Sequence, residues 1–194
     1  MDLKYIRSII NDPPETTTDY FMKSYRTCES YFNRILFIGL RLKGIKYSQA
    51  EGILRTTFIP IRDSLGKGLQ LIDDKKSEQI LKQKAVQDAY RLFLSFSSPY
   101  RNLVSHGVFT EINDKRTLEL LVKTNVKLLK ELEHELGRVF NHSAFDKPKD
   151  WGAKKSNRVY TENEIRELKL GYDAKEPIST NEAEKRYNNI DWLH

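Results

Sequence analysis

The sequence has little cysteine and no long apolar run, and these scarcities exclude several classes of protein. Among its 194 residues Cys28 is the single cysteine, so no internal disulfide forms, and the four histidines have no zinc-site spacing. No apolar stretch approaches the roughly 20 residues that span a bilayer, and residues 1–20 show no secretory signal. We therefore expect a protein of a reducing, cytoplasmic compartment that uses no membrane, metal or cofactor.

The composition indicates a folded protein with a modest preference for polyanions. Hydrophobic residues make up 39% of the chain and charged residues 31%, which excludes a disordered chain. The formal net charge is +6 at pH 7. Residues 143–194 contain ten basic and ten acidic side chains, so the whole excess belongs to residues 1–142. A polyanionic partner would bind that part of the chain.

Alternating β-branched runs are also lacking, and the apolar periodicity is helical. We expect an all-α fold, a bundle of four to five helices over residues 1–142, followed by a C-terminal extension over 143–194. The expected long helices cover residues 18–42, 49–72, 77–96 and 115–140, with a split at Pro60 and a cap at Asp114. The extension begins as a linker and contains two short helices, over 162–170 and 181–189.

Two of the expected long helices have a polar residue in their apolar face: Cys28 in the first helix and Asn125 in the last. The residues at helical spacing in the first helix are Phe21, Tyr25, Cys28, Phe32 and Ile35. Cys28 lies within this row, which indicates a buried structural thiol and not a nucleophile. Asn125 stands in the last helix where another apolar residue is expected.

The sequence SSPYRNLVSHGVF, residues 97–109, interrupts the helices with polar side chains. Ser98 and Pro99 are typical of a helix start and Gly107 of a helix end, so we expect a short helix between them. On such a helix Asn102 and His106 share a face. Arg101 lies about 140° around the axis from His106 but is long enough to reach it. Its position in the first turn favours an anion, so the segment predicts a phosphate-sized anion site beside an imidazole.

The six residues from Arg101 to His106 resemble the signature of the HEPN superfamily. In that family an arginine, often followed by asparagine, precedes a histidine by four to six intervening residues, beside the third and fourth helices of a bundle. Here four residues intervene, Asn102 follows Arg101, and Gly107 follows His106. The resemblance covers about residues 16–142 in architecture but only six or seven residues in motif.

The resemblance implies a metal-independent ribonuclease with Arg101, His106 and Asn102 as its catalytic residues. The best-known members are toxins, antiphage effectors and components of CRISPR systems, so the implied partners are RNA and an antitoxin or defence-system protein. A single histidine does not easily act as base and acid at once, and family members form a composite cleft. We therefore expect a homodimer. In one toxin group a partner enzyme modifies a tyrosine four residues after the histidine; Thr110 stands there, so this regulation is not expected.

Two alternatives follow from the same residues. A HEPN-like bundle can lack catalysis and bind nucleic acid, a nucleotide or a partner protein through the groove that these residues would line. The chain could also be a plain helical adaptor, in which His106 only makes local hydrogen bonds and the extension recruits another subunit.

Overall fold

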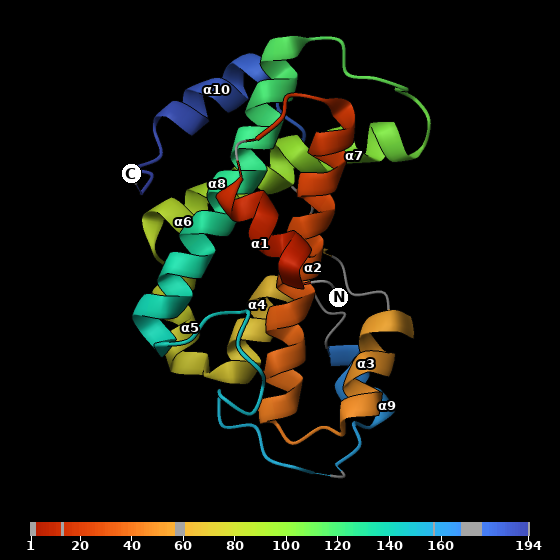
Figure 1. Ribbon diagram of the computed structural model, residues 1–194, viewed down its shortest axis with the longest axis vertical. Coiled ribbons are helices and arrows are strands. Elements are labelled where there is room, and N and C mark those ends of the chain that lie inside the picture. The colour runs from red at the N-terminus through yellow and green to blue at the C-terminus, as the bar shows by residue number, and fades with distance from the viewer. Residues whose placement is uncertain (1–2, 13, 57–60, 157, 168–175, 194) are drawn as a thin grey trace. The chain divides into compact units, whose positions relative to one another are not determined.

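The computed structural model describes residues 3–12, 14–56, 61–156, 158–167 and 176–193, and these residues confirm the all-α fold (Figure 1). Within them a single isolated bridge, between Ile45 and Arg158, is the only strand-like pairing. The helices are α1 Leu3–Asn11, α2 Thr18–Leu42, α3 Tyr47–Thr56, α4 Ile61–Ile72, α5 Asp74–Leu81, α6 Lys84–Leu92, the π-helix η1 Phe93–Ser97, α7 Ser98–Ser105, α8 Lys115–Phe140, α9 Glu162–Glu167 and α10 Thr180–Asn188. None of the helices in the described ranges has the length and hydropathy needed to cross a membrane.

The chain divides into two compact units, and the long helices α2 and α8 each contribute to both. Unit 1 contains Met1–Cys28, Lys82–His134 and Ala174–His194, and unit 2 contains Glu29–Leu81 and Glu135–Asp173. The division expected after residue 142, between a bundle and an extension, concerns independent folding and stays a prediction.

The core of unit 1 forms around the apolar face of α2, as the spacing predicts. Phe21, Tyr25 and Cys28 are buried, and the thiol of Cys28 donates to the carbonyl oxygen of Asn125 at 3.6 Å. Asn125 is itself fully buried, and its Nδ2 donates to Oγ of Ser24 at 2.9 Å. The amide in the apolar row of α8 therefore hydrogen-bonds a matching hydroxyl on α2, and Cys28 is structural.

The core of unit 2 includes a residue from the region expected to be a linker. Tyr160 packs in an apolar cluster with Leu36, Phe37, Leu40, Ile45, Ala50 and Ile53. After it, Thr161 and Glu164 cap α9 reciprocally: the Thr161 amide donates to Oε2 of Glu164 at 2.9 Å, and the Glu164 amide donates to Oγ1 of Thr161 at 3.3 Å.

Helix bounds agree with the sequence where capping is local. Helix α2 has the expected bounds, and Asp114 caps α8, accepting from the amides of Arg116 at 3.3 Å and Thr117 at 3.2 Å. The hydrogen bond from the Thr117 hydroxyl lowers the pKa of the Asp114 carboxyl.

Other bounds differ from the sequence-based expectation. The helix expected over 77–96 is two helices, α5 and α6, because the side chain of Gln83 accepts from the Val86 amide at 2.7 Å and starts a new helix. Helix α1, with Ile6 and Ile9 buried, was not expected. Pro60, where a split was expected, and residues 168–170, the end of an expected helix, lie outside the described residues. The described helices α3 and α4 lie before and after Pro60 in the chain.

Two glycines in unit 2 allow α2 and α4 to approach closely. A Cβ added at Gly68 would lie 2.6 Å from the backbone nitrogen of Leu36, and one at Gly39 would lie 2.7 Å from the carbonyl oxygen of Gly68. Both contacts are with backbone atoms, which cannot rotate away as a side chain can. The crossing of these helices therefore requires the absence of a side chain at both positions.

Gly68→Ala is expected to destabilise the protein by about 1–3 kcal/mol, although alanine favours helices, because the helices must separate. Gly66→Ala is the matched control on the same helix. Nothing lies within 4 Å of its added Cβ, so the free energy of unfolding should stay constant or rise by up to about 1 kcal/mol. Urea denaturation of both variants tests this, and equal stabilities would contradict the close approach.

Candidate functional site

The segment that contains the predicted site is the end of one continuous helical run and not a separate capped helix. Backbone dihedrals at Leu92, Phe93, Ser97 and Ser98 are all right-handed helical, and α6, η1 and α7 follow without a break. The predicted Ser98 cap is therefore wrong. The Ser98 amide donates to the carbonyl oxygen of Phe93, and its hydroxyl lies 3.0 Å from Oη of Tyr25. Since α7 has no free N-terminus, the expected anion-binding first turn does not form.

Pro99 explains why the helix widens at this place. A proline inside a helix has no N–H for the carbonyl four residues earlier, and its ring clashes with that carbonyl. Here the carbonyl belongs to Ser95, in the middle of η1, where π-type hydrogen bonding lengthens the turn. The Ser95 carbonyl accepts instead from the backbone N–H of Ile178, at 3.1 Å. A distant segment thus supplies the hydrogen bond that Pro99 cannot.

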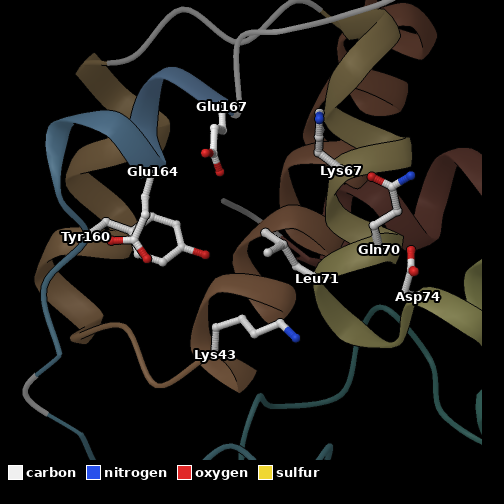
Figure 2. Close-up of a pocket in the computed structure, with 8 residues that line it drawn as sticks. All are labelled: Lys43, Lys67, Gln70, Leu71, Asp74, Tyr160, Glu164 and Glu167. Atoms are coloured by element: carbon white, nitrogen blue, oxygen red, sulfur yellow. The ribbon is translucent and has the colours of Figure 1, made fainter.

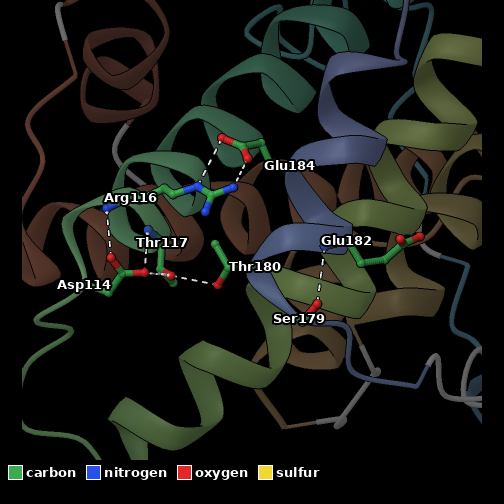
Figure 3. A network of polar contacts seen from close by, with 7 residues as sticks. All are labelled: Asp114, Arg116, Thr117, Ser179, Thr180, Glu182 and Glu184. Carbon is green, nitrogen blue, oxygen red and sulfur yellow. Dashed lines mark hydrogen bonds and ion pairs between the residues drawn. The ribbon is translucent and has the colours of Figure 1, made fainter.

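Ile178 belongs to residues 176–193, here named the strap, which packs on unit 1. Figure 3 shows its start: the hydroxyls of Thr180 and Thr117 lie 2.7 Å apart, and Arg116 forms a bidentate ion pair with Glu184. This pair lowers the pKa of the Glu184 carboxyl.

The far end of the strap packs on α8. The Leu193 amide donates to Oε1 of Glu131 at 2.7 Å, and Lys127 Nζ donates to the Leu193 carbonyl at 2.9 Å. Glu131 is consequently buried, although the sequence places it on a polar face of α8. Ala183 and Ile190 of the strap are buried as well, so the strap is part of the packed structure of unit 1.

Arg101 and Asn102 lie together over an aromatic stack. Arg101 Nη1 donates to Oδ1 of Asn102 at 3.1 Å, and the guanidinium carbon lies 5.5 Å from the ring centre of Tyr25. The Tyr25 ring stacks on Phe93 with centroids 5.0 Å apart, and Phe93 stacks on Tyr90. Tyr25 thus contacts α7 twice, through its hydroxyl at Ser98 and through its ring at Arg101, and this sets the direction of the guanidinium.

His106 ends the same helix, as the sequence predicts. Gly107 has a φ of +70°, its amide donates to the Val104 carbonyl at 3.1 Å, and the Val108 amide donates to the Leu103 carbonyl at 2.9 Å. These two bonds form a Schellman motif, which needs the left-handed conformation that glycine adopts at low cost. The His106 imidazole is exposed there. Beside it the side chains of Val108 and Phe109 are 63% and 39% exposed.

Among the described residues a side-chain hydrogen bond joins two of the three predicted catalytic residues. Arg101 and Asn102 are hydrogen-bonded, whereas His106 is linked to Asn102 only through its backbone N–H, at 2.9 Å from the Asn102 carbonyl. Tyr25 is the residue that sequence reasoning missed: its helical spacing marked it as core, and nothing local revealed its contacts with α7. Within the described residues no group of three or more His, Cys, Asp or Glu side chains could hold a metal ion.

No family model, no curated protein and no solved structure matches this chain. The resemblance to the HEPN superfamily rests on residues 101–107 and on the helices on either side of them.

The role of Pro99 is testable by a double-mutant cycle with Ile178. Ile178→Pro removes the N–H that the buried Ser95 carbonyl accepts, and should destabilise the protein by about 1–3 kcal/mol. In the Pro99→Ala background the loss should be smaller, because residue 99 then has its own N–H for that carbonyl. Chemical denaturation of the four proteins measures the coupling. Ile178→Ala, which keeps the N–H, is the control, and additivity within about 0.5 kcal/mol would contradict the mechanism.

Proposed function

We propose that this protein is a metal-independent endoribonuclease of the HEPN type, acting in antiphage defence or as a toxin. The observation that supports it most is the arrangement on α7. Arg101 is held by Tyr25 and Asn102 on one part of the helix, and His106 is exposed at the end of the same helix. A guanidinium in a defined direction and an accessible imidazole are the two groups that RNA cleavage without metal requires.

The proposed reaction uses the RNA's own 2′-hydroxyl as nucleophile. A base removes its proton while the oxygen bonds to the adjacent phosphorus; the bond from phosphorus to the 5′-oxygen breaks, and that oxygen takes up a proton. The products are a 2′,3′-cyclic phosphate and a 5′-hydroxyl. Histidine suits the proton transfers because imidazole in general titrates near neutral pH. Arg101 would stabilise the extra negative charge on the phosphorane, with Asn102 orienting the guanidinium.

A second copy of the chain would complete the site. One histidine per chain does not readily serve as both base and acid, whereas a two-fold dimer supplies two histidines and two arginines. The exposed Val108 and Phe109 directly follow His106 and Gly107, and burying them would favour a contact between two copies there. An antitoxin or defence-system protein is the expected further partner.

One observation favours a second candidate, a HEPN-like module that binds RNA or a nucleotide without cleaving it. Arg101 is hydrogen-bonded to Asn102 and directed over Tyr25, so its contacts within the described residues are those of a positioned phosphate-binding group. In such a module Arg101 would bind phosphate and His106 would have no chemical role.

Cleavage assays in EDTA separate the two candidates. Arg101→Ala and His106→Ala should each lower the cleavage rate by about 100-fold or more, because each removes a group that acts in the transition state. Arg91→Ala and His134→Ala are matched controls, since both side chains are exposed on neighbouring helices. Products with 2′,3′-cyclic phosphate ends support the enzyme. Binding of RNA without cleavage by the wild type supports the module, and neither binding nor cleavage refutes both.

The dimer is tested by light scattering at tens of micromolar. The wild type should have the mass of a dimer, and Phe109→Asp should be monomeric and should lose cleavage, because a carboxylate cannot be buried at low cost in an apolar contact. Val159→Asp, at an exposed apolar residue in unit 2, is the control and should stay dimeric. A monomeric wild type that still cleaves RNA would remove the composite site.

A further inference from the structure

Unit 2 contains a cavity, and none of the residues that line it belongs to α7 or to the strap. It measures about 310 Å³, at the lower end of the range for small-molecule sites. Helices α4 and α5 form one wall, the segment from Tyr160 through α9 forms the opposite wall, and the residue after α2 lies at its lower edge (Figure 2). The lining residues are Lys43, Lys67, Gln70, Leu71, Asp74, Tyr160, Glu164 and Glu167.

Tyr160 places a hydroxyl in this cavity from a rigid position. Its side chain is 8% exposed and packs in the apolar cluster of unit 2. Gln49 holds its backbone on both sides, accepting from the Tyr160 amide at 2.8 Å and donating to its carbonyl at 3.1 Å.

The hydroxyl of Tyr160 points toward the open middle of the cavity and makes no hydrogen bond within the described part of the chain. Burial raises the pKa of Tyr160, so the hydroxyl remains a donor at neutral pH. The carboxylate of a ligand in the cavity would accept a hydrogen bond from this donor.

The charged side chains of the cavity have both signs, and four of the five form no ion pair within the described residues. Lys67 and Glu167 lie on opposite walls of the cavity (Figure 2). Neither of them, nor Lys43 or Asp74, forms an ion pair among the described residues. Glu164 differs, because it pairs with Arg158 and caps α9. Two ammonium groups and two carboxylates are therefore available, with a formal charge that sums to zero.

We propose that this cavity binds a small zwitterion of the amino-acid class. The ligand carboxylate would contact Lys43, Lys67 and the Tyr160 hydroxyl. Its ammonium would contact Glu167, and Leu71 would contact its apolar part. A purely anionic ligand would lie against two carboxylates, and a purely cationic one against two ammonium groups, at a cost that a zwitterion avoids.

The proposal does not rest on ribonuclease activity, and the full chain tests it. Each of the 20 common L-amino acids is titrated at up to about 10 mM by calorimetry or NMR, and at least one should bind with a Kd in the millimolar range or below. Its N-acetyl form lacks the ammonium and its amide form lacks the carboxylate. Both should bind about tenfold more weakly, because each loses a charge-assisted hydrogen bond.

Substitutions locate the binding. Lys67→Met, Glu167→Gln and Tyr160→Phe should each weaken it, the first two by about tenfold or more. Lys75→Met and Glu51→Gln, in the same unit but outside the lining, should leave it unchanged, and circular dichroism confirms that each variant is folded. The proposal is overturned if no amino acid binds, if the acetylated and amidated forms bind as well as the parent, or if binding persists unchanged in both charge variants.

Discussion

A proline inside a helical run is the constraint on which unit 1 depends. Pro99 leaves the buried Ser95 carbonyl without its usual donor, and the helix responds by widening over Phe93–Ser97. The backbone N–H of Ile178 completes the hydrogen bonding. Because a buried carbonyl without a partner is costly, the strap and the wide turn stabilise each other. The segment after the turn carries the residues of interest, so their positions depend on contacts with residues distant in the sequence.

Tyr25 connects this constraint to the proposed chemistry. It holds Ser98 through its hydroxyl and Arg101 through its ring, and it is itself stacked on Phe93 of the wide turn. The guanidinium is therefore oriented by packed aromatic residues and not by a free helix end. An arginine fixed in this way has less side-chain entropy to lose when it binds a phosphate. The cavity of unit 2 follows the same principle, since Gln49 and the apolar cluster fix the position of Tyr160.

Local signals in the sequence were sufficient for several elements. The 3.6-residue periodicity and nearby caps predicted α2, α8 and the Asp114 cap, and Gly107 ends α7 in the conformation expected of it. Each of these depends on residues within one or two turns. The Ser98 cap was wrong because serine followed by proline is a start signal only where the preceding chain is not helical. That condition depends on η1, and η1 depends on Pro99 together with Ile178.

The sequence by itself determined the two longest helices, α2 and α8, the apolar side of each, and the end of α7 at Gly107. The tertiary structure decided the partners of the polar groups. Glu131 is buried because Leu193, 62 positions away, donates to it, and Tyr160 is fixed by Gln49, 111 positions away. Periodicity reports only the direction of a side chain from its own helix axis. The identity of the group that it meets depends on how distant segments pack, and no local pattern contains that information.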